Sequence, residues 1–139
     1  MLGVRDPAIY GRDTLADIEK MCTRQAKELG LTMDFRQSNL EGELVTWIQE
    51  ARGKAAGIVI NPGAYGHTSI ALLDALQVAE LPVIEVHLSN IHRRERFRHH
   101  TYTSQAATGV ICGLGAKGYV LALDAMANLV KPGLIKKKD

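Results

Sequence analysis

The sequence has few cysteines, little net charge and no long apolar run, and each absence excludes a class of protein. Its 139 residues include only Cys22 and Cys112, which lie far apart and form no CxxC pair. This pattern favours a reduced, cytoplasmic protein over a disulfide-rich secreted one. No apolar run approaches the ~18 residues that a membrane span needs, and no signal-peptide pattern follows Met1. The net charge of +2 is too small to indicate nucleic-acid or membrane partners.

What is present is typical of one globular domain over residues 1–139, with a basic tail from about residue 131. Hydrophobic residues make up 46% of the chain and charged residues 23%. Apolar periodicity predicts helices over 14–29, 39–52, from about 68 to before Pro82, and 114–130. The same patterns predict strands over 31–35, 57–60, 82–88 and 108–112. This alternation predicts an α/β fold, a parallel sheet with helices on both faces, whose ligands bind at the carboxyl ends of the strands.

Local signals mark the ends of two of these helices. Thr14 is the expected N-cap of the first helix, with Asp17 completing a capping box. Asn39 is the expected N-cap of the second helix. The segment between them alternates apolar and polar side chains from Leu31 to Phe35, as a half-buried strand does.

A polar turn follows the strand that ends at Ile60. Asn61 stands at the strand end, and His67 lies just ahead of a helix N-terminus, where backbone N–H groups favour an anionic group. An ordinary strand–helix turn capped by Thr68 explains the same residues equally well.

The next strand places three polar side chains on one side. Alternation puts Glu85, His87 and Ser89 together, and ionisable groups between apolar neighbours are costly to bury without a purpose. Glu85 and His87 form a candidate acid/base pair, although a hydrogen-bonded core histidine is the alternative. The basic run at 93–98 is, for most of its arginines, a solvated surface segment.

Two further motifs suggest cofactors and are rejected. The histidines His87, His92, His99 and His100 show neither HxxxH nor HExxH spacing, so no metal is expected. Gly113–Gly118 matches GxGxxG, but no strand with an acidic residue follows, as dinucleotide binding requires. These glycines are expected to allow close helix–sheet packing or a tight turn. Near the start, Arg5 and Tyr10 share a Pro/Gly-bounded loop, where the cation would favour tyrosinate.

Taken together, these segments resemble the type II 3-dehydroquinate dehydratases. The similar blocks run in the family's order over nearly the whole chain: 2–11, 35–39 with 41–44, 61–69, 85–90, 97–100 and 109–115. The resemblance implies a flavodoxin-like three-layer sandwich, assembled as a homo-oligomer, usually a dodecamer that is a tetramer of trimers. It also implies a cytoplasmic, cofactor-free lyase that dehydrates 3-dehydroquinate by anti elimination through an enolate.

The resemblance also implies a role for each matching residue. Tyr10 would take the C2 proton as tyrosinate, Arg5 would keep it ionised, and His87 would protonate the departing C1 hydroxyl. Asn61 would stabilise the enolate, and Glu85 would orient His87. The remaining substrate-binding residues would be His67, Leu88, Ser89, Arg98 and, across a subunit interface, Asp74.

Two departures from the family pattern qualify these expectations. The family begins with a central strand that ends in Asn-Gly-Pro-Asn, and this strand is absent from the given sequence. Its absence makes a non-catalytic flavodoxin-like binding or assembly protein the alternative function. Gly66 stands where a bulkier polar residue is expected, and we expect only a local effect.

Overall fold

The structure is a computed structural model and describes residues 13–130. Its first element is the helix α2 (Leu15–Glu28), whose start is fixed by side chains. The Thr14 hydroxyl accepts a hydrogen bond from the Asp17 N–H (3.1 Å), and the Asp17 carboxylate accepts one from the Thr14 N–H (3.0 Å). The capping box satisfies N–H groups that a helix start leaves without partners. The expected capping box is thereby confirmed.

Three parallel strands form the sheet: β1 (Ile58–Ile60), β2 (Val83–His87) and β3 (Gly109–Cys112). Their order is β1-β2-β3, so β2 lies in the middle and all of its residues are buried. In the register of the sheet, Ile60 lies beside Glu85 and His87 beside Cys112. The carboxyl ends of β1, β2 and β3 therefore meet at one edge.

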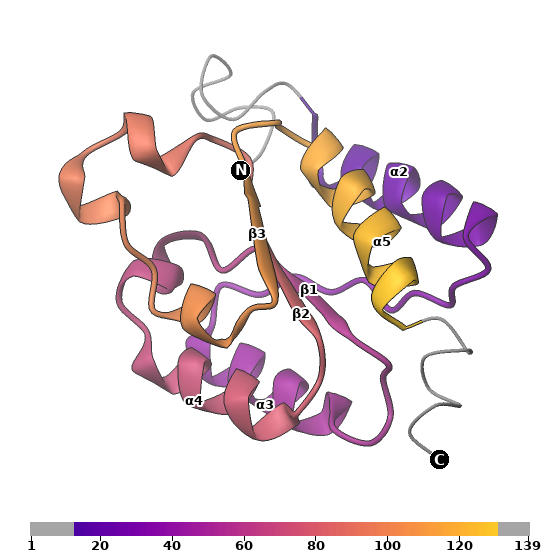
Figure 1. The fold of residues 1–139 in the computed structure, drawn as a ribbon, viewed down its shortest axis with the longest axis horizontal. Helices are drawn as coiled ribbons and strands as arrows, with labels where there is room; N and C mark the ends of the chain where they lie inside the picture. Colours follow the sequence, from indigo (N-terminus) through magenta and orange to yellow (C-terminus); the bar gives the residue numbers. More distant parts are fainter. Residues whose placement is uncertain (1–12, 131–139) are drawn as a thin grey trace.

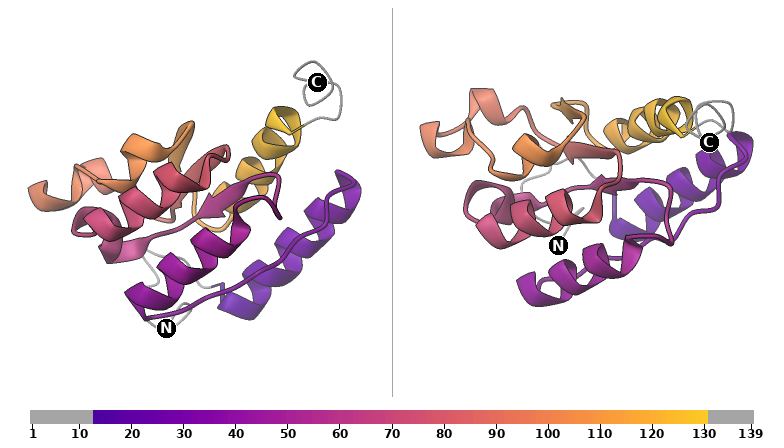
Figure 2. Two further views of the ribbon diagram at one scale, coloured as in Figure 1. Left: turned by 90° about the horizontal axis from the view of Figure 1, so that it is seen from below. Right: turned by 60° about the horizontal axis from the view of Figure 1, so that its bottom comes forward.

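Helices cover both faces of this sheet, which gives three layers (Figures 1 and 2). The helices α3 (Glu41–Ala51) and α4 (Ile70–Ala79) pack on one face, with the β2 residue Val83. The helices α2 and α5 (Lys117–Leu129) cover the other face. There α5 packs on Ile84 and Val86 of β2. The side chains of β2 thus alternate between two apolar layers, and Glu85 lies in the layer of Val83.

Short 3-10 helices connect the elements at the site edge. The helix η1 (Gly63–His67) follows β1 and leads into α4, which Ser69 caps, rather than Thr68, by accepting from the Leu72 N–H (2.9 Å). Between β2 and β3 lie three more, η2 (Ile91–Arg93), η3 (Arg96–Arg98) and η4 (Thr103–Ala106). In Figure 1 these three segments extend beyond the sheet on the side opposite α2 and α5.

Two local predictions were wrong. Asn39 is not a helix cap: α3 has Leu40 at its N-cap position without a side-chain bond, and the Asn39 backbone oxygen accepts from the Tyr65 hydroxyl (2.7 Å) instead. The predicted strand at 31–35 is extended and alternately half-buried, with Met33 and Phe35 packed on the α2 core, but it is not a strand. A strand needs a hydrogen-bonded neighbour as well as an alternating pattern, and the described residues pair only β1, β2 and β3.

The glycine-rich segment after β3 serves packing, as expected. Gly113 and Gly115 have φ values of +90° and +60°, which L-residues with side chains rarely adopt. A Cβ atom on Gly118 would lie 3.2 Å from Val86 Cγ1, so the start of α5 sits directly on the sheet. The GxGxxG pattern therefore reflects a tight turn and close helix–sheet contact.

Candidate active site

Polar side chains gather at the carboxyl edge of the sheet, as the strand pattern predicted. Asn61 directly follows β1, His87 ends β2, and Leu88 and Ser89 continue from it. Leu88 and Ser89 are 6% and 9% exposed. The Leu88 carbonyl already accepts from the Gly115 N–H (3.0 Å), which ties this edge to the turn after β3.

Glu85 and His87 form a buried pair in the middle of this edge. Their side chains are 0% and 5% exposed, and His87 Nε2 lies 2.6 Å from Glu85 Oε2. An ionised carboxylate only accepts hydrogen bonds, so Nε2 must carry the proton of this bond. The contact fixes the neutral tautomer of His87 and leaves Nδ1 as the nitrogen for a substrate.

Hydrogen bonds keep Glu85 ionised in spite of its burial. Burial raises the pKa of this carboxyl, but hydrogen bonds from His87, Thr103 and Thr101, together with the charge on His87, outweigh it. The pKa of Glu85 consequently lies below its usual value. The carboxylate can therefore act as a fixed negative charge behind the imidazole.

His67 lies beside this pair, from η1. Its ring centroid is 6.1 Å from that of His87, with the planes 29° apart. His67 Nδ1 donates to the backbone oxygen of His100 (2.9 Å), so the neutral ring presents Nε2 as an acceptor. A hydroxyl group of a ligand is a suitable donor for that nitrogen.

Tyr119 holds Asn61, an interaction that the sequence reasoning missed. The Asn61 amide nitrogen donates to the Tyr119 hydroxyl (2.8 Å), and its oxygen accepts from the Gly63 N–H (3.0 Å). Burial raises the pKa of Tyr119, more than the hydrogen bond from Asn61 lowers it, so the phenol stays protonated. The amide is held at both ends while a second N–H remains for a ligand.

Replacing Tyr119 by phenylalanine is expected to reduce kcat about 3- to 10-fold, with little change in the fold. The reason is that the Asn61 nitrogen loses its acceptor, and with it the net free energy of about one ordinary hydrogen bond. Steady-state kinetics check this. Tyr65→Phe is a matched control, because its hydroxyl bonds Asn39 and not Asn61. An equal loss of activity in both variants would contradict a specific role for Tyr119.

Two partly buried arginines lie in the segment after β2, and one of them contacts the same edge. Arg98, 20% exposed, pairs with Glu95 (3.3 Å), and its guanidinium lies over the Phe97 ring. Arg94, which the sequence reasoning did not select, donates to the Ser89 hydroxyl (3.5 Å) and is only 17% exposed. Both cations are within reach of Glu95, so the run at 93–98 is partly structured and not wholly a solvated segment.

Three further expected site residues are not part of the described cluster or are not described. Asp74 is exposed on α4. Arg5 and Tyr10 lie outside the described residues. The structure therefore brings together Asn61, His67, Glu85, His87 and Ser89, and Arg98 lies in η3, where it contacts Glu95 and Phe97.

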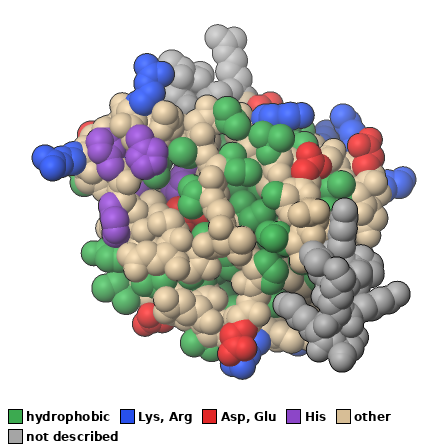
Figure 3. Space-filling view, in the orientation of Figure 1, with side chains coloured by type: hydrophobic (Ala, Val, Ile, Leu, Met, Phe, Trp, Pro, Cys, Tyr) green, Lys and Arg blue, Asp and Glu red, His purple; other side chains and the backbone are tan. Residues whose placement is uncertain are grey.

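Several histidines gather on one side of the molecule, over the segments between β2 and β3 (Figure 3). A hollow of about 160 Å³ there is lined by Ile91, His92, His99, His100, Thr101, Ser104 and Val110. Within residues 13–130, no three His, Cys, Asp or Glu side chains are placed to hold a metal ion. In the same range no helix is long and apolar enough to cross a membrane.

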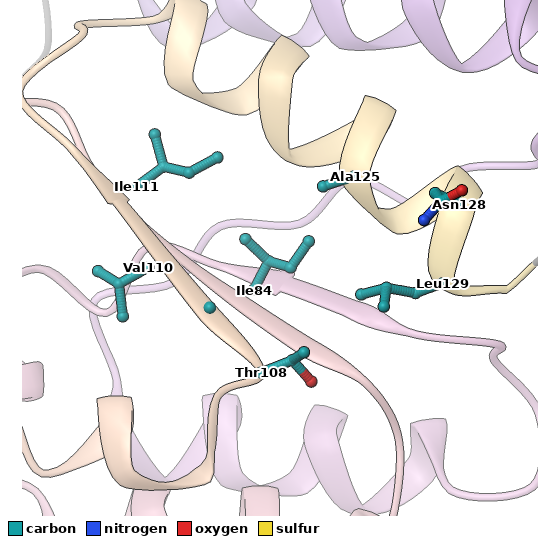
Figure 4. Close-up of a pocket in the computed structure, with 8 residues that line it drawn as sticks. Ile84, Thr108, Val110, Ile111, Ala125, Asn128 and Leu129 are labelled. Carbon is teal, nitrogen blue, oxygen red and sulfur yellow. The ribbon is translucent and has the colours of Figure 1, made fainter.

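A larger pocket, about 290 Å³, lies between β3 and α5 (Figure 4). Its lining is mostly apolar and includes Ile84, Ile111 and Leu129. Thr108 and Gly109 line it too. Its β2 residue, Ile84, points to the α5 face of the sheet, whereas Glu85 points to the other face. The size of this pocket therefore does not make it the reactive site.

Comparison with known proteins agrees with this geometry. The family model "Dehydroquinase class II" matches residues 1–127. The 3-dehydroquinate dehydratase of Rhizobium meliloti (strain 1021) is 60% identical over 130 residues, which cover 94% of this chain and 88% of that relative. The 3-dehydroquinate dehydratase of Streptomyces coelicolor is 59% identical over 134 residues, which cover 96% of this chain and 85% of the relative.

Solved structures give the same result. The type II dehydroquinase from Propionibacterium acnes has a TM-score of 0.88 at 46% identity, over 91% of this chain and 88% of that one. The type II dehydroquinase from Butyrivibrio crossotus has a TM-score of 0.87 at 40% identity, over 90% of this chain and 88% of that one. The chain therefore belongs to the class II dehydroquinase family.

Proposed function

We propose that this protein is a hydro-lyase that converts 3-dehydroquinate to 3-dehydroshikimate and water, the dehydration step of the shikimate pathway. The observation that carries the proposal is the buried Glu85–His87 pair at the carboxyl edge of the sheet, in a chain about 60% identical to proteins named 3-dehydroquinate dehydratase. A carboxylate-backed imidazole suits the delivery of a proton to a departing hydroxyl.

In the proposed reaction each residue has the role that the family resemblance implies. Tyr10, as tyrosinate held by Arg5, removes the C2 proton, and the electron pair moves onto the C3 oxygen to form an enolate. The second N–H of Asn61 stabilises that developing charge, directly or through a water. His87 enters the next step as the imidazolium, with protons on both ring nitrogens. The enolate then collapses, the C1–O bond breaks, and His87 gives its Nδ1 proton to the leaving hydroxyl. His87 ends as the neutral Nε2–H tautomer, which is already bonded to Glu85. Loss of the C2 proton from Tyr10 to solvent and uptake of a proton by His87 Nδ1 restore the starting state.

The remaining polar groups orient the substrate. His67 and Ser89 form hydrogen bonds with the hydroxyls of the substrate, and Arg98 pairs with its carboxylate. Backbone groups of Leu88 and Ser89 complete the binding site. Asp74 reaches the site of a neighbouring subunit, which its exposure on α4 allows. The protein is then a homo-oligomer, a dodecamer made of four trimers, and works in the cytoplasm. Its mass in solution, measured by light scattering, tests the assembly.

Turnover of 3-dehydroquinate is the deciding experiment. The product contains a conjugated enone, so conversion appears as new ultraviolet absorbance. Purified protein is expected to produce it at a rate proportional to enzyme concentration. Tight binding of 3-dehydroquinate without turnover would instead favour the alternative, a non-catalytic binding or assembly protein. The high sequence identity to proteins named 3-dehydroquinate dehydratase favours the enzyme over the non-catalytic protein.

The reaction is expected to need neither a metal ion nor an imine. None of the strands contains a lysine that could form a desolvated Schiff base, as far as residues 13–130 show. Prolonged dialysis against a chelator should leave kcat unchanged. Sodium borohydride added with substrate should not inactivate the enzyme. Loss of activity under either treatment, restored by metal ion in the first case, would contradict a mechanism through tyrosinate and His87 alone.

A further inference from the structure

The carboxylate of Glu85 receives hydrogen bonds from two threonine hydroxyls besides the one from His87. The Thr101 hydroxyl donates to Oε2 (2.8 Å), which His87 Nε2 also reaches, and the Thr103 hydroxyl donates to Oε1. Thr101 is 4% exposed and Thr103 is 0% exposed. Both oxygens of the buried carboxylate therefore have a donor that is not His87.

The direction of the Thr101 bond is set by the ionised carboxylate. The lowered pKa of Glu85 leaves its oxygens without a proton, so the Thr101 hydroxyl gives its hydrogen to Oε2. The same hydroxyl oxygen accepts from the Ser104 N–H (3.3 Å), which holds it in place. The network thus favours the ionised carboxylate and, through it, the Nε2–H form of His87.

The position of Thr103 is set by close packing against η1. A Cβ atom on the buried Gly66 would lie 3.3 Å from the Thr103 hydroxyl oxygen and 2.8 Å from Pro62 Cγ. The Tyr102 N–H donates to the Gly66 carbonyl (2.8 Å). The absence of a side chain at Gly66 leaves the space beside the Thr103 hydroxyl, and the backbone bond holds the two segments together.

The same short stretch also supports His67, through the backbone oxygen of His100. Residues 100–104 therefore touch both histidines of the site, one directly and one through Glu85. These contacts orient His67 and Glu85, although no side chain of the 100–104 segment has a role in the proposed reaction.

We propose that Thr101 and Thr103 are positioning residues: their hydroxyls hold the Glu85 carboxylate so that it keeps Nε2 of His87 protonated, and Nδ1 is the nitrogen that takes up the catalytic proton and then delivers it. The inference rests on the proposed function, in which His87 is the acid. No residue of the 100–104 segment takes part in the proposed reaction directly. Its threonines would act through Glu85.

Other ionisable groups lie around this pair within residues 13–130. The strand β1 and the helix η4 contain none. The His67 ring stacks on that of His87, Cys112 is in register with His87, and Arg94 bonds the Ser89 hydroxyl. Further groups are Arg98, the exposed Asp74 of α4 and the Tyr119 phenol, which bonds Asn61. All of these groups are the same in Thr103→Ala and Thr103→Ser, so a difference between the two pH profiles can be assigned to the lost hydroxyl on Glu85.

The sharpest test compares Thr103→Ser with Thr103→Ala, because both lose the same methyl group and only one keeps the hydroxyl. Thr103→Ala is expected to lower kcat about tenfold or more with KM little changed, as loss of a hydrogen bond to a charged group does. Thr103→Ser is expected to stay within ~2-fold of the wild type, since it keeps that hydrogen bond. Thr46→Val is a control, because that exposed hydroxyl bonds only the Gly42 carbonyl of its own helix.

The pH profile separates positioning from mere stability. With one donor fewer, the pKa of Glu85 rises, so activity in Thr103→Ala should fall at a higher pH on acidification than in Thr103→Ser. A lower Tm with an unchanged kcat and pH profile would show a purely structural role and overturn the inference. Thr101→Ser and Thr101→Ala repeat the comparison if Thr103→Ala does not fold.

A readout without substrate keeps this test independent of the proposed function. Nitrogen-15 spectra of the histidine rings should show neutral His87 as the Nε2–H tautomer in the wild type and Thr103→Ser, and as a mixture in Thr103→Ala. The same tautomer in both variants would overturn the inference even in an active enzyme. Absence of turnover by the wild type would overturn the proposed function and leave this spectral result to decide the role of the threonines.

Discussion

Replacing His87 by glutamine is expected to reduce kcat by about 10²- to 10⁴-fold, the usual contribution of a general acid or base. Glutamine places an N–H near the position of Nε2, so Glu85 keeps a donor and is not left as an uncompensated buried charge. It has no proton to give to the leaving hydroxyl. Steady-state kinetics should therefore show a large loss in kcat with little change in KM or Tm.

The step at which this variant stops is also predictable. Removal of the C2 proton precedes the use of the acid, so His87→Gln should still exchange that proton for deuterium from heavy water, which NMR of recovered substrate detects. Full retention of dehydration in His87→Gln would show that another group protonates the hydroxyl. Loss of both exchange and binding would point to a disturbed site instead of a missing acid.

Replacing Tyr10 by phenylalanine is expected to reduce kcat at least ~10²-fold, as loss of a general base does. Tyr10 lies outside the described residues, so this expectation rests on the loop it shares with Arg5 and on the resemblance. The variant should bind substrate nearly normally, because the binding groups at the sheet edge are untouched. Turnover and substrate affinity, measured on the same preparation, check the two halves of this expectation.

Deuterium exchange distinguishes this variant from the previous one. Tyr10→Phe should lose exchange at C2 together with dehydration, whereas His87→Gln should keep it. Tyr65→Phe is again the control, since its hydroxyl bonds the Asn39 backbone. Near-normal turnover in Tyr10→Phe would exclude Tyr10 as the base.

The central pair was predictable because strand geometry is strict. Side chains two positions apart in a strand point to the same face, so the alternation of 85, 87 and 89 with apolar residues was enough to place Glu85 beside His87. The capping box at Thr14 was equally local. A local signal was not always enough, since Asn39 was wrongly predicted to cap a helix and its backbone oxygen instead accepts from Tyr65, a residue 26 positions away.

The supports of the site were not predictable in this way. Thr101 and Thr103 lie 16 and 18 residues beyond Glu85, and Tyr119 lies 58 residues beyond Asn61. Irregular segments have no period that would bring these hydroxyls to their partners. The prediction of a strand at 31–35 was wrong for a related reason. A sequence pattern shows which side chains are buried, but it does not show whether a neighbouring strand is there to pair with.

The position of β2 has a consequence for how the protein opens locally. Amide hydrogens in the middle strand, buried throughout, should exchange with solvent only on global unfolding, whereas those of the η2–η4 segments should exchange through smaller openings. Exchange measured by mass spectrometry checks this order. Glu85 and His87 sit on the slow element and their threonine partners on the faster one. His87 thus stays in place through most local fluctuations. Each opening of the 100–104 segment, however, briefly leaves the Glu85 carboxylate without its threonine donors.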